Sequence, residues 1–347
     1  MSSDNTVVID NEVRKIHALF FSRAPVSAEL IDSSRGDADF RNTLIFTAAD
    51  GEKQVLKIVS NDFTFPEKIR MWQRTIEEYL ALGYYCPRIF ADKQGGFPEV
   101  SFRNHNCVAY AEEYSKYRSL EDRTACMEKR LNDVYDAYLK DIWSMTARIA
   151  AKKFDYTNYP SAYCLFETFC PSDRTDEVLE NALEWKAAAE SLPERFSGQV
   201  QRIWQRWSEN REKLEPLYRR LPTSVFQADL NSTNLLIDEE GNFKGVFDFN
   251  LCGKDVFLNY LMRENDSETI PEALKIAREY YVFSEEEKEA ALPLFRCLKP
   301  LWWSSIQELK DAGSDEEAIK RCLDAAESRQ TEEIDFRSCM EAPKTAE

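Results

Sequence analysis

The 347-residue chain is 43% hydrophobic and carries 62 Asp and Glu against 45 Lys and Arg, for a formal net charge of −17. This composition provides for a large buried core and excludes a disordered chain, and the acidic balance argues against a nucleic-acid-binding surface, which needs clustered Lys and Arg. The nine Cys have no regular spacing and form no C-x-x-C pair, so we expect no disulfide framework, no zinc site and a reducing, cytoplasmic setting. No apolar run approaches the ~18 residues that a membrane span needs, so no membrane partner is expected.

The first part of the chain has the pattern of a small mixed region. Apolar side chains at helical spacing over residues 9–23 predict an opening amphipathic helix. Residues 42–48 and 54–59 are strand-like runs joined around Asp50-Gly51, which predicts a hairpin. The region therefore begins as a helix followed by antiparallel strands.

The next part of the chain has the pattern of one helix and further strands, followed by a mainly helical region. A helix is expected from Pro66, since proline favours the first turn and the apolar residues that follow have helical spacing. Residues 98–115 have the pattern of further strands. After residue 115 long periodic stretches predict a mainly helical region, at residues 128–152, 176–190, 196–218, 271–281 and 285–328. Several tryptophans on these stretches are expected in the core rather than in a ligand cage: Trp204, Trp207, Trp302 and Trp303.

Lys57 interrupts the apolar run Val55-Leu56-Lys57-Ile58-Val59. A lysine in such a run is rarely left unpaired inside a fold, because an isolated buried charge is costly. The pattern therefore indicates a lysine with a specific partner or ligand. The alternative is a lysine on an edge strand, where it would discourage aggregation.

Residues 226–250 contain the chain's densest group of candidate site residues. Asp229 and Asn234 have a D-x-x-x-x-N spacing, and Asp248 follows inside an apolar run. A carboxylate there is costly unless it is paired or binds a cation, and the oxygens of Asn and Asp suit Mg²⁺. The spacing alone is weak in so acidic a chain, and Asp248 could be a turn carboxylate. The three residues in this order, with strand-like runs between them, indicate a magnesium site.

The segment "QADLNSTNLLID" followed by "GVFDFN" resembles the catalytic and metal-binding pattern of the aminoglycoside phosphotransferase-like kinases. The resemblance implies an α+β, two-lobed protein-kinase-like fold, with a nucleotide-binding lobe at residues 1–111 and a helical lobe carrying the site at 112–347. It implies ATP- and Mg²⁺-dependent phosphorylation of a hydroxyl on a small molecule, such as an aminoglycoside, an amino sugar, a choline-like alcohol or another metabolite. Asp229 would be the catalytic base, and Asn234 and Asp248 the metal ligands.

The same resemblance assigns the nucleotide contacts. Lys57 would bind the phosphates and pair with a glutamate of the following helix, where Glu67 is favoured over Glu77 and Glu78 although the usual position falls near Trp72. Residues 34–37 occupy the place of the loop over the phosphates, but with one glycine they are equally compatible with an ordinary turn. Backbone groups at the end of the last small-lobe strand would bind adenine: Tyr110, Ala111, Glu112 and Glu113.

Two departures from the family pattern leave other functions open. Gln227 and Ala228 replace the usual His-Gly before the catalytic Asp. A nucleotide-binding pseudokinase or a non-catalytic interaction protein is therefore the alternative to an enzyme. The acidic excess, together with the resemblance, motivates the hypothesis of a cationic acceptor; the alternative is an acidic surface that only keeps the protein dispersed in solution.

Overall fold

The computed structural model describes residues 7–121 and 134–341. Spatial contacts divide the chain into two units. Unit 1 consists of Met1–Asp136, Cys170–Ser172 and Asp229–Leu251, and unit 2 of Ala137–Phe169, Asp173–Ala228 and Cys252–Glu347. This division groups Asp229–Leu251 with the N-terminal part, whereas the sequence-based division at residue 111 grouped it with the helical part.

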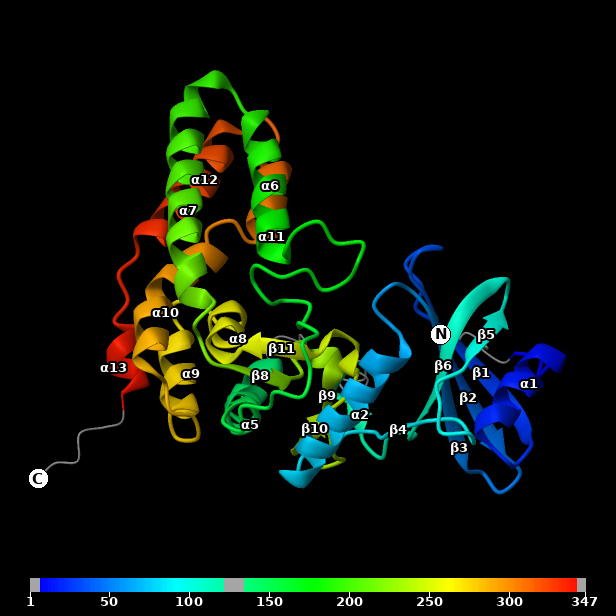
Figure 1. The fold of residues 1–347 in the computed structure, drawn as a ribbon. Coiled ribbons are helices and arrows are strands. Elements are labelled where there is room, and N and C mark those ends of the chain that lie inside the picture. The colour runs from blue at the N-terminus through cyan, green and yellow to red at the C-terminus, as the bar shows by residue number, and fades with distance from the viewer. Residues whose placement is uncertain (1–6, 122–133, 342–347) are drawn as a thin grey trace, which may run out of the picture. The chain divides into compact units, whose positions relative to one another are not determined.

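Unit 1 is built on a six-stranded antiparallel sheet with the order β1-β2-β3-β6-β4, in which β5 also pairs with β6 (Figure 1). Buried side chains such as Phe46, Leu56 and Ile58 form its core, against which Val13 and Ile16 of the first helix pack. The elements are α1 (Asn11–Phe20), β1 (Pro25–Asp32), β2 (Phe40–Ala48), β3 (Lys53–Ser60), α2 (Pro66–Ala81), β4 (Ile89–Phe90), β5 (Glu99–Phe102) and β6 (His105–Glu112).

The predicted hairpin is confirmed as the pair β2 and β3. Its turn contains Gly51 at φ +85°, a conformation that glycine adopts without steric cost. Burial alternates strictly along β2, so Arg41, Thr43 and Ile45 lie on the face opposite the core. In the register of the hairpin, Thr43 faces Lys57 of β3.

A second, three-stranded sheet of unit 1 has the order β10-β9-β7. Its strands are β7 (Arg118–Ser119), β9 (Leu235–Ile237) and β10 (Phe243–Val246), with η3 (Ser232–Asn234) before β9 and η4 (Phe249–Leu251) after β10. Gly245 bridges to Tyr85, and a Cβ at this position would lie 1.8 Å from the Tyr85 backbone oxygen. Only glycine therefore permits this close approach of the two chain segments.

Unit 2 is mainly helical, with the short antiparallel pair β8 (Thr223–Phe226) and β11 (Gly253–Val256). Of the helix predicted over 128–152, residues 128–133 lie outside the described part. Trp207 is buried, with its indole N–H donating to the Cys297 carbonyl, whereas Trp303 is exposed. The helices are α5 (Leu139–Ala150), α6 (Glu177–Glu190), α7 (Ser197–Tyr218), α8 (Phe257–Glu264), α9 (Ile270–Ala277), α10 (Glu285–Leu298), α11 (Trp303–Ala312), α12 (Glu316–Thr331) and α13 (Phe336–Met340), with the 3₁₀ turns η1 (Asp136–Tyr138) and η2 (Glu194–Phe196).

Among the helices of the described residues, none has the length and apolar character to cross a membrane.

Candidate active site

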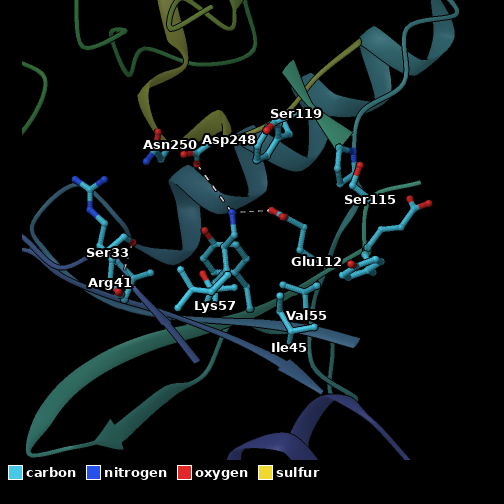
Figure 2. Close-up of a pocket in the computed structure, with 18 of the residues that line it drawn as sticks. Ser33, Arg41, Ile45, Val55, Lys57, Glu112, Ser115, Ser119, Asp248 and Asn250 are labelled. Atoms are coloured by element: carbon cyan, nitrogen blue, oxygen red, sulfur yellow. Dashed lines mark hydrogen bonds and ion pairs between the residues drawn. The ribbon is translucent and has the colours of Figure 1, made fainter. Parts of the chain in front are cut away.

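A cavity of about 600 Å³ lies within unit 1 (Figure 2). One wall consists of alternate residues of β2 and β3, including Arg41, Ile45, Val55 and Lys57, because side chains two apart share a face of a sheet. The segment after β6 and residues 247, 248 and 250 also belong to the lining. The cavity thus gathers side chains that lie more than 200 positions apart in the sequence, from Ile31 to Asn250.

Lys57 is the cation at the centre of this lining. Its Nζ lies 3.1 Å from Glu112 Oε2 and 3.9 Å from Asp248 Oδ1, as the dashed lines in Figure 2 show. Burial alone would lower the pKa of Lys57, but its neighbours, led by Glu112, outweigh that cost and raise the pKa. Since β3 lies between β2 and β6, the interpretation of Lys57 as an edge-strand lysine is wrong.

The partner of Lys57 differs from the helix residue that the sequence favoured. Glu67 lies exposed in the first turn of α2, where a negative charge interacts well with the helix dipole. Glu112 lies at the end of β6, and its side chain is only 13% exposed. The correction is therefore from Glu67 to Glu112, and its cause is the pairing of β3 with β6.

Asp248 occupies a left-handed backbone conformation, with φ +60°. Asp and Asn are the non-glycine residues that adopt this region most readily. The Phe247 N–H donates to the Asn234 carbonyl at 3.1 Å, which places Asp248 directly after a residue bonded to Asn234. Asp248 lines the cavity opposite Lys57, with its side chain 38% exposed.

Asp229 and Asn234 lie in one hydrogen-bonded loop. The Asn234 amide nitrogen donates to the Asp229 carbonyl at 2.8 Å and to its Oδ2 at 3.1 Å. The Asn231 amide donates to the other carboxylate oxygen at 2.9 Å. The Tyr135 hydroxyl donates a hydrogen bond of 2.6 Å to the carbonyl of Leu230, the residue that follows Asp229. The Asp229 carboxylate is therefore held in a fixed orientation, and the Asn234 amide oxygen accepts a hydrogen bond from the Thr233 hydroxyl at 3.2 Å.

The residues of this region fit a divalent cation. Asn234 and Asp248 supply one amide and one carboxylate oxygen, the hard donors that Mg²⁺ prefers. Beside them, the amide oxygen of Asn250 is buried without a hydrogen-bond partner among the described residues, and Asn250 lines the cavity. Within residues 7–121 and 134–341 no three His, Cys, Asp or Glu side chains form a metal cage. A cation here would complete its coordination with water and phosphate oxygens.

The strand ladder engages the backbone positions that the sequence assigned to adenine. β6 lies between β3 and β4, so Ala111 and Glu112 face ladder partners on both sides, whereas Tyr110 faces only Lys57 of β3. The Glu113 N–H donates to the Arg88 carbonyl at 2.7 Å. Tyr110, Glu112 and Glu113 line the cavity, and the lining continues at residues 114 and 115.

Arg41 is a cavity residue that the sequence did not indicate. Its guanidinium forms two hydrogen bonds of 2.6 Å with Asp39 and lies over the Phe63 ring at 5.1 Å. The alternation of β2 could have identified Arg41, since it places residue 41 on the face of Thr43 and Ile45. Ser33, from the loop after β1, lines the cavity beside it.

The family model for the phosphotransferase enzyme family matches residues 34–259. The chain belongs to this family. A search among curated proteins gave no match. Among solved structures, the fold is similar to an amicoumacin kinase in complex with AMP-PNP, Ca²⁺ and Ami, with TM-score 0.51, 13% identity, and 91% of this chain and 92% of that chain covered. It is also similar to a microcompartment-associated aminopropanol kinase, with TM-score 0.51, 14% identity, and 91% and 94% of the two chains covered.

These similarities confirm the predicted α+β protein-kinase-like fold, with an N-terminal antiparallel sheet and a mostly helical C-terminal part. They also confirm the resemblance read from residues 226–250, which lie inside the matched range.

Proposed function

We propose that this phosphotransferase moves the terminal phosphoryl group of ATP to a hydroxyl of a small molecule, with Mg²⁺ as cofactor. The observation that carries the proposal is the placement of Lys57 and Asp248 in one cavity of unit 1, with Asn234 bonded to both the catalytic-loop Asp229 and the residue before Asp248. This is the set of groups that phosphoryl transfer by positioning and charge stabilisation requires.

Each residue has a distinct role in this proposal. Lys57, held in its charged form, contacts the nucleotide phosphates. Asn234 and Asp248 hold Mg²⁺, which neutralises charge on the phosphates when bound. Asp229 orients the acceptor hydroxyl for in-line attack and accepts its proton, because both of its oxygens are already oriented by amide donors.

For the acceptor we propose a small hydroxylated molecule that carries an amine. The excess of acidic over basic residues favours a cation, and the proteins of similar fold include an aminopropanol kinase. A cationic acceptor should bind more weakly as salt rises, because the Debye length falls to about 8 Å at physiological ionic strength. A best acceptor that is neutral or anionic, with KM indifferent to salt, would contradict the amine and leave the kinase proposal intact.

A screen of hydroxyl-bearing metabolites for Mg²⁺- and acceptor-dependent ATP consumption tests the proposal. We expect one class of acceptor to support turnover, and an Asp229→Asn variant to reduce that turnover about 10³-fold. Tight Mg·ATP binding without turnover on any acceptor would instead favour a pseudokinase, for which the Gln227-Ala228 replacement is the motivating feature.

A further inference from the structure

The side chain of Lys57 is mostly buried and needs a carboxylate beside it to hold its orientation. Helix α2, which the resemblance implied as the source, does not supply this carboxylate. Two glutamates of α2, Glu67 and Glu77, are exposed, and Glu77 bonds Arg88 instead. Among the described residues, no acidic side chain of α2 forms an ion pair with Lys57. The helix position nearest to the expected glutamate is Trp72, whose side chain is 1% exposed.

Trp72 faces β6 rather than the lysine. Its ring packs edge-on against Tyr110, with centroids 6.2 Å apart, and Tyr110 is the register partner of Lys57. An aromatic pair therefore fills the space between α2 and the sheet. A carboxylate for Lys57 has to come from the sheet itself.

Glu112 supplies that carboxylate. In the antiparallel register Lys57 pairs with Tyr110 and Val55 with Glu112, so Glu112 lies diagonal to Lys57 on the cavity face. The Nζ to Oε2 distance is 3.1 Å, and the two side chains are 17% and 13% exposed. Such a pair is screened little by solvent, and loss of one partner leaves an uncompensated charge.

We infer that Glu112 is the positioning residue for Lys57, in place of a helix glutamate. The inference rests on the proposed nucleotide function. Because both members of the pair belong to neighbouring strands of one sheet, the orientation of Lys57 does not depend on the placement of α2. Glu112 also keeps Lys57 from turning fully to Asp248, which leaves that carboxylate for the metal.

The test compares Glu112→Gln with Glu67→Gln, which neutralises the rival glutamate. Mg·AMP-PNP affinity by calorimetry should fall about tenfold or more in the first variant, the scale of removing the support of a ligand-holding side chain, and stay within twofold of wild type in the second. If Glu112→Gln does not fold, Glu112→Asp, which keeps the charge but withdraws it by one methylene, takes its place and should also weaken binding.

A second measurement reports on the pair without nucleotide. Urea unfolding of Lys57→Met, of Glu112→Gln and of the double variant gives the coupling between the two side chains. Because each single variant leaves one buried charge uncompensated, the double variant should lose less stability than the sum of the two single losses. The same cycle with Glu67→Gln in place of Glu112→Gln should be additive.

The outcomes separate the inference from the proposed function. Wild-type affinity in a folded Glu112→Gln protein, together with additive losses in the Lys57 and Glu112 cycle, would overturn the inference alone. A wild-type protein that binds no Mg·AMP-PNP would overturn the proposed function and the nucleotide role of Glu112, while the cycle would still decide whether Glu112 is the partner of Lys57.

Discussion

Replacing Asp248 with Asn should separate metal binding from folding. Asn adopts the left-handed conformation at φ +60° as readily as Asp, so the backbone should lose nothing, whereas Ala would add about 1 kcal/mol of strain. The charges of Asp248 and Lys57 lie 3.9 Å apart, and at an effective dielectric constant of 20 their attraction would contribute about 4 kcal/mol to stability. Because the Asp248 side chain is 38% exposed, solvent screening reduces this to about 1 kcal/mol or less.

The expected loss in ligand affinity is larger than this loss of stability. Asp248 would be the only charged protein ligand of the cation, and loss of one preorganised charge contact weakens binding about 10²-fold, or about 2.7 kcal/mol. Calorimetry with Mg·AMP-PNP and urea unfolding measure the two quantities on the same protein. Glu99→Gln, an exposed carboxylate on β5, is the charge-matched control and should change neither. Unchanged affinity in a folded Asp248→Asn protein would refute the metal assignment.

Three further variants test other parts of the site. Lys57→Met should lower ATP affinity or kcat about 10²-fold. It also leaves Glu112 unpaired. Burial raises the pKa of Glu112 above its unfolded value, so stability is lost as pH rises through the raised pKa. Urea unfolding should therefore show a larger loss of stability at pH 8 than at pH 5, and equal losses would contradict the pairing. Asp229→Asn should keep Mg·AMP-PNP affinity within about threefold and reduce kcat about 10³-fold in a coupled ATP assay, the middle of the range for a general base. A parallel loss of affinity would argue for a metal-binding role. Gly245→Ala should destabilise unit 1 by about 2 kcal/mol or more in urea, because its Cβ would meet the Tyr85 oxygen at 1.8 Å, and unchanged unfolding would show that the two segments can separate.

The parts of the site that were predictable from sequence carry local signals. Lys57 and Asp248 each place a charge inside an apolar run, and that contrast is visible without knowing the fold. The hairpin of β2 and β3 has its turn residues beside its strands, so local chemistry determines it.

The parts that were not predictable depend on pairing between distant segments. Glu112 is the partner of Lys57 because of the register between β3 and β6, and no local sequence pattern encodes that register. The strands expected over residues 98–115 end at Glu112, and strand ends are the least certain feature of a sequence pattern. In the sheet of β7, β9 and β10, the runs of β9 and β10 around their Gly-Asn turn were visible in the sequence, whereas β7 was missed because a two-residue strand has no periodicity.

The most direct test of the account is the stability of the wild-type protein with AMP-PNP in the presence and absence of Mg²⁺. A ligand at 100 times its dissociation constant should add about 2.7 kcal/mol to the free energy of unfolding. We predict this stabilisation with Mg²⁺ and little of it when the metal is chelated, since Asp248 and the phosphates would then repel each other. No stabilisation by millimolar nucleotide with Mg²⁺ present would contradict the assignment of the unit 1 cavity as a nucleotide site.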